Sequence, residues 1–221
     1  MSEQATSLIS KELISNFLTI VRSQVTDLHG SSWENIEIAL NDRMTKIIKR
    51  NKARIIDAPS KRWLLLASMI LAFYKELIVI IKDEHTVFTL LRDTMAAPLK
   101  EGITTYIADR FGIAQDAPGE AFDRIAQNFK TRGEERFGQA YTYVQEVQDE
   151  RRSFVSVQKC LISDFFRANQ MSELALIFCA MDDVWADELS KPQYGVRFER
   201  PTTLARGDDM CRFQFSKTTV E

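Results

Sequence analysis

All three cysteines of the chain fall in its last third, as Cys160, Cys179 and Cys211. Two adjacent carboxylates, Asp182 and Asp183, follow the second cysteine by one turn of a predicted helix. A thiol becomes a nucleophile when its pKa is lowered, for example at a helix N-terminus or beside a cation. A carboxylate one turn away can act as a general base or hold a positively charged amine. These five residues are therefore the candidates for chemistry.

Each cysteine has its own local setting. Cys160 follows a lysine and begins a predicted helix, which is a position that lowers the pKa of a thiol. Cys179 lies in an apolar helical stretch, LALIFCAM. Cys211 alternates with Phe213 and Phe215 on a predicted strand, so these three side chains share one face. Spacing alone favours packing over catalysis, because free cysteines are most often buried as small hydrophobic residues.

Other kinds of site find little support among the residues present. The two histidines, His29 and His85, are far from the cysteines in sequence, so we expect no Cys-His dyad. The cysteines form no Cys-x-x-Cys pair, and convergence of the three thiolates with an aspartate on a metal is the weaker alternative. The chain has no Gly-x-Gly-x-x-Gly, Walker loop or nucleophile elbow. We therefore expect neither a cofactor nor a bound metal.

The composition is that of an ordinary globular protein. The 221 residues are 45% hydrophobic and 27% charged, with a net charge of −2. Without an excess of positive charge, neither nucleic acid nor an anionic membrane surface is an expected partner. We interpret the short basic run 46–54 as a solvated helix face. We predict one domain over residues 1–221 and a small molecule as its partner, and the sequence leaves a homo-oligomer open.

The most apolar run, 63–81, has about the length of a membrane span. Lys75 and Glu76 stand near its middle, where charges are costly in lipid, so we predict a buried core helix and no membrane. The N-terminus shows no secretory pattern, and the odd number of cysteines favours free thiols. A cytoplasmic location is the expectation that follows.

Hydrophobic periodicity predicts an α+β fold, with a helical layer, mostly N-terminal, packed on a C-terminal antiparallel sheet of about four strands. The helical scaffold covers about 8–130 and the site-bearing part about 138–217. Helices are predicted over 8–28, 33–54, 61–81, 84–98, 99–111, 120–130, 160–169 and 173–180. Strands are predicted over 140–147, 153–157, 194–200 and 210–216, the first two as a hairpin and the last two joined by a turn at 205–209. Gly207 would supply a positive φ in that turn.

The segment 157–215 begins with VSVQKC, continues with Ser-Glu-Leu at 172–174 and then has Cys-x-x-Asp, which is Cys179 and Asp182. The pattern R-x-x-T-L-A-x-G-x-x-x-C-x-F-x-F follows over 200–215. In the order and spacing of these motifs the segment resembles the L-2-amino-thiazoline-4-carboxylic acid hydrolase family, and all three cysteines fall on family cysteine positions. Arg212 departs from the family, which commonly has an acidic or small polar residue there. That departure bears on the substrate more than on the fold.

This resemblance implies a small-molecule hydrolase. The family's named reaction opens a cyclic amidine, because water adds to C2 of 2-aminothiazoline-4-carboxylate and gives N-carbamoyl-cysteine. We expect a hydrolase of a cyclic amidine or amide C–N bond in an amino-acid-derived substrate, in a biosynthetic pathway. Either a thiolate attacks the carbon, or an aspartate activates water while the thiols shape the pocket.

The resemblance also selects site residues. Cys179 and Asp182 are the expected reactive pair, Cys211 faces the same cavity, and Cys160 is the candidate for an activated thiol. A bidentate contact from an arginine would hold the substrate carboxylate. The predicted substrate-binding residues are Arg200, Arg206, Asp183 and Glu173.

A non-enzyme function is the alternative. Glycine followed by Cys-x-Phe near the C-terminus also occurs in small-molecule-binding domains that resemble the vinyl-reductase module. On that interpretation the protein is a sensory module without turnover, and its cysteines line an apolar pocket or hold a metal.

Overall fold

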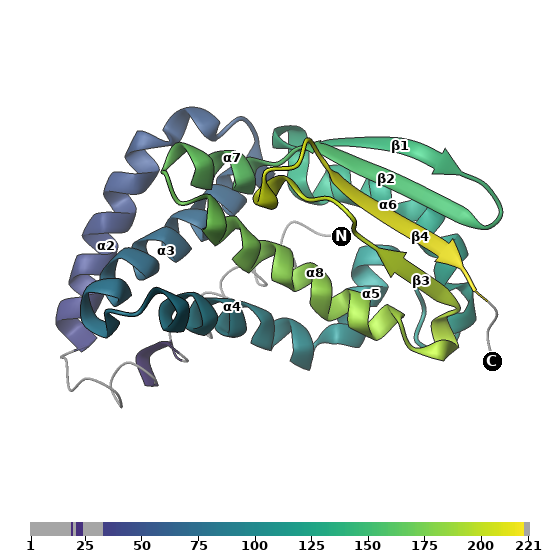
Figure 1. Ribbon diagram of the computed structural model, residues 1–221, viewed down its shortest axis with the longest axis horizontal. Coiled ribbons are helices and arrows are strands. Elements are labelled where there is room, and N and C mark those ends of the chain that lie inside the picture. Colours follow the sequence, from purple (N-terminus) through teal and green to yellow (C-terminus); the bar gives the residue numbers. More distant parts are fainter. Residues whose placement is uncertain (1–18, 20, 24–32, 219–221) are drawn as a thin grey trace.

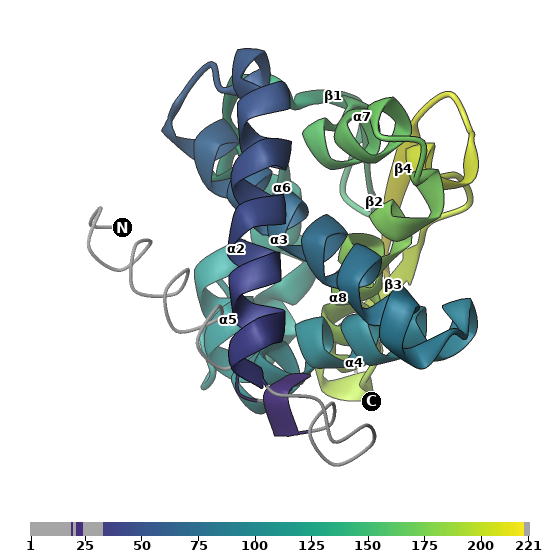
Figure 2. The ribbon, with the colours of Figure 1, turned by 90° about the vertical axis from the view of Figure 1, so that its left-hand side faces the viewer.

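A layer of helices packs against a four-stranded antiparallel sheet that lies along one side of the molecule (Figures 1 and 2). The computed structural model describes residues 19, 21–23 and 33–218. Most of the helix predicted over 8–28 lies outside these residues. The α+β architecture expected from the periodicity is confirmed.

The N-terminal half of the described chain is helical, as predicted. Its helices are α2 (Trp33–Arg50), α3 (Ala58–Ile81), α4 (Glu84–Glu101), α5 (Ile103–Phe111) and α6 (Ala121–Phe137). Helix α3 runs through the middle of this layer and is packed by α2, α4 and α7 (Leu161–Ala168). Its burial follows from its sequence, since nearly every residue of 63–74 is apolar and each buried apolar side chain adds roughly 1.5–3 kcal/mol of stability.

Helix α3 begins three residues earlier than predicted. Pro59 is accommodated in the first turn of the helix, because its missing backbone N–H needs no helical partner there. Asp57 accepts a hydrogen bond from the Ser60 backbone N–H at 2.7 Å, and the Ser60 hydroxyl accepts one from the Asp57 N–H at 2.9 Å. This reciprocal capping box satisfies two backbone donors at the helix start.

By length and composition, α3 is also the one helix in the described part of the chain that could cross a membrane. Of its most apolar stretch, 61% is buried by the rest of the protein, as expected of a core helix. Lys75 and Glu76 are only half-buried, and Glu76 forms an ion pair with Arg43 of α2. The charges near the middle of α3 therefore lie on the side of the helix that its neighbours leave partly open.

Two helices extend beyond their predicted ends. Helix α4 continues past Pro98, which lies in its last turn. Helix α6 runs seven residues beyond the predicted end at 130 and stops at Gly138, whose φ is +72°. Gly133 lies inside this extension. A Cβ at this position would come within 2.8 Å of the Tyr143 ring, so a larger residue would not fit without a shift of the ring. The glycine that weakens the helical pattern is thus needed for close packing of α6 on the sheet.

The sheet confirms the four predicted strands and the hairpin. Its strands are β1 (Thr142–Gln148), β2 (Arg152–Lys159), β3 (Val196–Glu199) and β4 (Cys211–Lys217), in the order β1-β2-β4-β3. The register pairs Val157 of β2 with Cys211 of β4. Buried residues alternate along β4, so Cys211, Phe213 and Phe215 share the inner face, as predicted. In the connection between β3 and β4, Gly207 has φ +93°, which is the positive value expected.

Helix α8 (Ala175–Leu189) ends nine residues beyond the predicted helix, which stopped at 180. Its second half is held by Trp185 and Leu189, both of which are buried. The Trp185 ring lies edge-on to Phe111 with 5.2 Å between ring centroids and is tilted against Phe198 at 4.8 Å. These contacts fix the helix that carries Cys179 and both aspartates against the sheet and α5.

Candidate active site

One small cavity brings together the three cysteines, Asp182 and Arg200. It lies between the inner face of the sheet and helices α5, α6, α7 and α8, and the loop 200–205 closes one side. Its volume is about 100 Å³. Pockets for drug-sized ligands measure roughly 300 Å³ or more. A cavity of this size suits a molecule of few heavy atoms.

Asp182 is the central carboxylate of the cavity. Its Oδ2 accepts a hydrogen bond from Arg200 Nη1 at 2.6 Å, and its Oδ1 accepts one from Trp185 Nε1 at 3.0 Å. The Arg200 guanidinium, 13% exposed, also contacts Asp183 Oδ1 at 3.2 Å. The side chain of Asp182 remains 30% exposed and that of Asp183 66% exposed. Water therefore reaches Asp182, while Asp183 stands at the outer end of the same arginine.

Burial and pairing act in opposite directions on these two charges. Burial raises the pKa of Asp182, while the charge of Arg200 and the Trp185 hydrogen bond oppose it, and the pKa ends above its usual value. Burial works to lower the pKa of Arg200, but the charge of Asp182 and the smaller effects of Cys179, Asp183 and Cys211 together outweigh it, so the pKa of that guanidinium is raised. A carboxylate with a raised pKa is a stronger base, and such perturbed groups cluster in active sites.

The surroundings of Cys160 do not produce the lowered thiol pKa that its position at a helix start predicted. Cys160 does precede the first residue of α7, but burial raises the pKa of its thiol to about 12, against weaker opposition from the backbone N–H groups of α7. Burial likewise raises the pKa of Cys179 to about 12. At pH 7 a thiol with such a pKa is ionised in about one molecule in 10⁵. Neither residue is an activated nucleophile in this arrangement.

Cys211 has the most polar surroundings of the three thiols. Its Sγ accepts a hydrogen bond from the Leu204 backbone N–H at 3.3 Å, and the Thr203 hydroxyl lies at 3.3 Å from the same sulfur. Burial nevertheless outweighs these contacts and raises the pKa of Cys211. The Thr203 hydroxyl also lies 3.9 Å from the sulfur of Cys179, so it links two of the thiols. Sequence reasoning missed Thr203, although it lies inside the recognised R-x-x-T motif.

Two predicted substrate-binding residues do not reach the cavity. Arg206 follows Leu204 in a short 3-10 helix (Leu204–Arg206), but its side chain is exposed and is not part of the lining. Glu173 lies in the short 3-10 helix before α8 (Ser172–Leu174), is exposed and is also absent from the lining. Asp183 contacts the cavity only through Arg200.

Several lining residues come from outside the family-like segment 157–215. Arg110 of α5, Arg136 of α6 and the neighbouring Tyr141 and Tyr143 all line the cavity. Burial raises the pKa of both tyrosines, so their hydroxyls are protonated donors at neutral pH. The sequence offered one signal for this part of the cavity, which is Arg110 on the apolar face of the predicted helix 99–111. A buried charge usually has a partner, so an arginine there indicates a polar site.

The metal-binding alternative gains no support from the described side chains. Among residues 19, 21–23 and 33–218, no three cysteine, histidine or carboxylate side chains come together closely enough to hold a metal ion. The three thiols surround the cavity without converging on one point.

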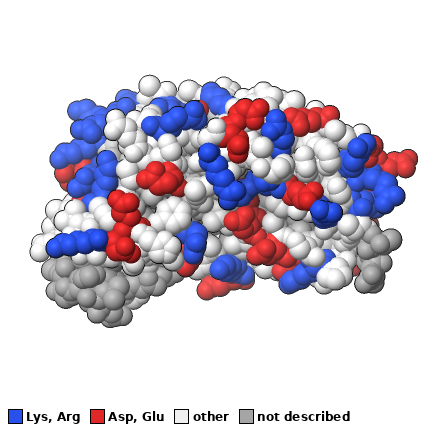
Figure 3. Space-filling view, viewed as in Figure 1, with Lys and Arg blue, Asp and Glu red and all other residues white. Residues whose placement is uncertain are grey.

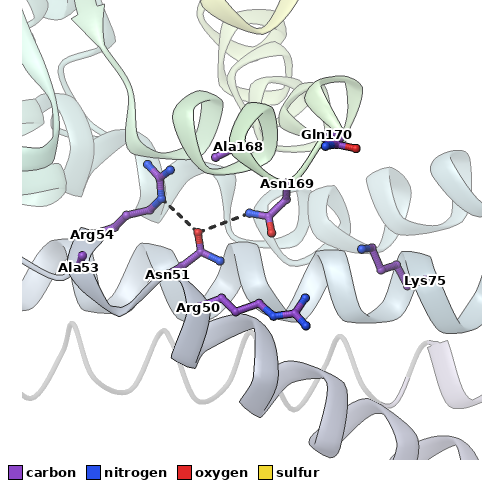
Figure 4. A pocket seen from close by; sticks show the side chains of 8 residues that line it. All are labelled: Arg50, Asn51, Ala53, Arg54, Lys75, Ala168, Asn169 and Gln170. Carbon is purple, nitrogen blue, oxygen red and sulfur yellow. Dashed lines mark hydrogen bonds between the residues drawn. The ribbon is translucent and has the colours of Figure 1, made fainter.

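A second, more open hollow lies where α2 and α7 end beside α3 (Figure 4). Its lining includes Arg50, Arg54 and Lys75 and no carboxylate. The Asn51 Oδ1 accepts hydrogen bonds from Arg54 Nε at 3.1 Å and from Asn169 Nδ2 at 3.5 Å, so the two reach it from either side. Two helix C-termini meet here, and their carbonyl groups attract cations. In the run 46–54, Lys46, Lys49, Arg50 and Lys52 are exposed, in agreement with the predicted solvated helix face.

The exposed charges of the face seen in Figure 3 are of both signs and intermingled. Many are paired locally along one helix, as Lys46 is with Asp42 at 2.6 Å and Arg124 with Glu120 at 2.8 Å. Such exposed pairs contribute little to stability, at about 0.3–0.5 kcal/mol each.

Residues 64–215 match the sequence profile of a family described as L-2-amino-thiazoline-4-carboxylic acid hydrolase. No curated protein matches the chain. Among solved structures, it is similar to the Fe(II) unliganded H-NOX protein from K. algicida and to an alanine-to-glycine mutant of that protein, at 11% and 10% identity. Each comparison covers 94% of this chain and 96% or 95% of the other, with a TM-score of 0.35. That score is too low to support an argument about fold or ligand.

Proposed function

The chain belongs to the L-2-amino-thiazoline-4-carboxylic acid hydrolase family, and from this premise we propose that it hydrolyses a small cyclic amidine or amide derived from an amino acid. The observation that carries the proposal is the cavity that Asp182, Arg200 and the three thiols share. These are the residues of the family-like motifs, and they come from three separate segments of the chain. The cavity also suits a substrate of few heavy atoms, because its volume is about 100 Å³.

The bond that breaks depends on the substrate. With 2-aminothiazoline-4-carboxylate, water adds to C2, and the product N-carbamoyl-cysteine keeps both nitrogens on that carbon. The bond that breaks is therefore C2–S, and the sulfur leaves as the thiol of the product after taking up a proton. A cyclic amide would instead lose its ring nitrogen. We accordingly define the reaction by the amidine or amide carbon that water attacks. The bond that breaks at this carbon is C–S or C–N, depending on the substrate.

Asp182 is the proposed general base. In this mechanism a water beside its carboxylate attacks the substrate carbon as the carboxylate takes up one of the water's protons. Arg200 holds the carboxylate in place through the 2.6 Å contact and stabilises its ionised form. The raised pKa of Asp182, which burial causes, makes it a more effective base than an exposed aspartate.

The thiols have a different role in this mechanism. Because burial raises the pKa of Cys160 and Cys179 to about 12, direct attack by water is favoured over attack by a thiolate. Neutral thiols contribute weak donors and a polarisable wall to the cavity. Of the two mechanisms that the sequence left open, this one requires no unfavourable ionisation of a buried sulfur.

Incubation with 2-aminothiazoline-4-carboxylate tests the proposal. We expect N-carbamoyl-cysteine by mass spectrometry and an equal amount of new free thiol by colorimetric titration. Intact-mass measurement during turnover should find no acyl adduct on the protein. If a panel of small cyclic amidines and amides binds but none is converted, the protein is a binding module and the hydrolase assignment is wrong.

A further inference from the structure

The cavity carries more positive charge than its described residues balance. Three guanidinium groups line it, on Arg110, Arg136 and Arg200, against the single carboxylate of Asp182. That carboxylate is already engaged by Arg200 at 2.6 Å. A buried charge without a counter-charge is costly, so an excess of cations around a small cavity favours an anionic ligand.

Arg110 is the most deeply buried of these cations, with 5% of its surface exposed. Its guanidinium carbon lies 4.6 Å from the centroid of the Phe129 ring and 5.4 Å from that of Phe111. Its Nη1 donates a hydrogen bond to the Phe129 carbonyl at 3.1 Å. It forms no direct ion pair with any residue in the described ranges, although its charge acts at longer range to lower the pKa of Asp182. The aromatic rings thus hold the guanidinium in place, while most of its N–H donors are available to a ligand.

Tyr141 presents a second unused donor. Its hydroxyl is buried beside the Cys160 thiol and the Ile162 backbone but forms no well-aligned hydrogen bond with the described residues, and the ring lines the same cavity. A buried hydroxyl without a partner costs free energy, which a ligand that accepts its hydrogen bond would recover.

We propose that Arg110 binds the anionic group of the molecule held in this cavity and that the Tyr141 hydroxyl donates to an acceptor on the same molecule. The inference rests on the proposed function to the extent that this molecule is the substrate, whose carboxylate is then the anion. Planar, two-point contact with a carboxylate is the geometry that a fixed guanidinium provides.

This assignment replaces the arginines that the sequence suggested. Arg200 donates to Asp182, to Asp183 and to the carbonyl of Cys179, so its donors are already engaged. Arg206 is exposed and outside the cavity lining. Arg136 lines the cavity and is only half-buried, with its guanidinium 5.3 Å from the Tyr106 ring centroid. Its desolvation cost is smaller than that of Arg110, and it therefore has less need of an anion.

Two aromatic probes that resist ring opening separate charge recognition from turnover. They are 2-aminothiazole-4-carboxylate and its neutral counterpart 2-aminothiazole-4-carboxamide, and calorimetry measures their binding to the full chain. The unaltered protein should bind the carboxylate about 10- to 100-fold more tightly than the carboxamide, as expected for a charge-assisted hydrogen-bond pair. Arg110→Gln should abolish this preference. Arg110→Lys should keep part of it, because it retains the charge without the two-point geometry.

Control variants complete the experiment. Arg167→Gln removes an exposed arginine that pairs with Asp164 and is outside the cavity, so it should leave both affinities unchanged. Tyr141→Phe should weaken both probes by a similar factor, because it removes a donor and no charge. If Arg110→Gln fails to fold, as judged by circular dichroism, the ratio of the two affinities in Arg110→Lys decides the matter.

The outcomes also distinguish this inference from the proposed function. Equal binding of the two probes, binding of neither, or a preference that survives undiminished in Arg110→Gln and Arg110→Lys and disappears in Arg136→Gln would each overturn the role of Arg110. Carboxylate binding through Arg110 without turnover of any amidine would support the inference and defeat the hydrolase. Turnover without carboxylate preference would defeat the inference alone.

Discussion

Arg200 joins the loop after β3 to helix α8 by its contact with Asp182, whose Oδ2 lies 2.6 Å from Nη1. The same guanidinium reaches Asp183, the next residue along the helix, at 3.2 Å. The two carboxylates share one cation but differ in position, because Asp182 lines the cavity and Asp183 is exposed. Asp182 and Asp183 are therefore a matched pair for mutation, because they share one cation and differ in exposure.

Asp182→Asn should lower kcat by about 10²–10⁴-fold, which is the usual contribution of a general base. Asp183→Asn removes an acid of the same type one residue away and should change kcat less than about threefold, because exposed ion pairs contribute little. Steady-state kinetics on 2-aminothiazoline-4-carboxylate provides the measurement. Equal losses in the two variants would show that Asp182 only supports the structure.

The rate should depend on pH through the ionisation of Asp182. A base acts when unprotonated, so activity rises with pH through the pKa of Asp182, which burial raises above the ordinary carboxyl value. Arg200 opposes that rise, and its removal in Arg200→Gln should therefore shift the acid limb of the kcat profile to higher pH. A shift to lower pH, or none, would contradict the proposed role of the pair.

The fold was largely predictable because its signals are local. The strands around Tyr143 and Phe213 alternate in polarity, and the α3 run is apolar almost throughout, so each element is specified by its own residues. Helix ends were less predictable, because contacts distant in sequence decide them. Close packing of the Tyr143 ring on α6 favours glycine at position 133 inside that helix. Helix α8 continues to Leu189 because the Trp185 ring packs against other aromatic rings.

The site was predictable in part. The motif residues Cys179, Asp182 and Cys211 do line one cavity, as their family-like order suggested. Arg110 and Tyr141 were missed because no spacing connects them to that motif, and only the folded chain brings α5 and the start of β1 to it. The pKa of Cys160 was predicted in the wrong direction because position at a helix start is visible in a sequence, whereas burial of the sulfur is not.

Alkylation by iodoacetamide tests the state of the thiols. With pKa values of about 12 for Cys160 and Cys179, the native protein should react at pH 7.5 at least 100-fold more slowly than the protein in urea, where thiols titrate near about 8.5. Mass spectrometry of peptides assigns the modified residue. One cysteine that reacts faster in the native protein than in urea would restore the thiolate mechanism.

Buried neutral thiols should also make stability decrease in alkali. The pKa of Cys160 is raised on folding, so its contribution is complete below its unfolded pKa and is lost as pH rises towards about 12. Between pH 8 and 10, one such thiol removes up to about 2 kcal/mol from the free energy of unfolding. In Cys160→Ala the free energy of unfolding should fall less over the same pH range, by that amount. Urea denaturation under reducing conditions provides the measurement.

The effect of Cys160→Ala below pH 7 provides the internal control. There the thiol is protonated in both states, so the difference in unfolding free energy between the two proteins should be constant with pH. An identical alkaline loss in the variant would show that Cys160 ionises as readily in the folded protein as in the unfolded chain.

The contact between Gly133 and Tyr143 connects the packing of α6 with the shape of the cavity. A Cβ at position 133 would come within 2.8 Å of two ring carbons of Tyr143, and that ring lines the cavity. Alanine is the better helix former by about 1 kcal/mol, yet overpacking a buried site costs about 1–3 kcal/mol, so Gly133→Ala should be destabilising or neutral and should displace the ring.

Gly119→Ala is the matched control, because nothing lies within 4 Å of its Cβ. Urea denaturation and the affinity for 2-aminothiazole-4-carboxylate should both be impaired in Gly133→Ala and unchanged in Gly119→Ala. A Gly133→Ala protein that is more stable and binds the probe normally would show that Tyr143 can move without altering the cavity.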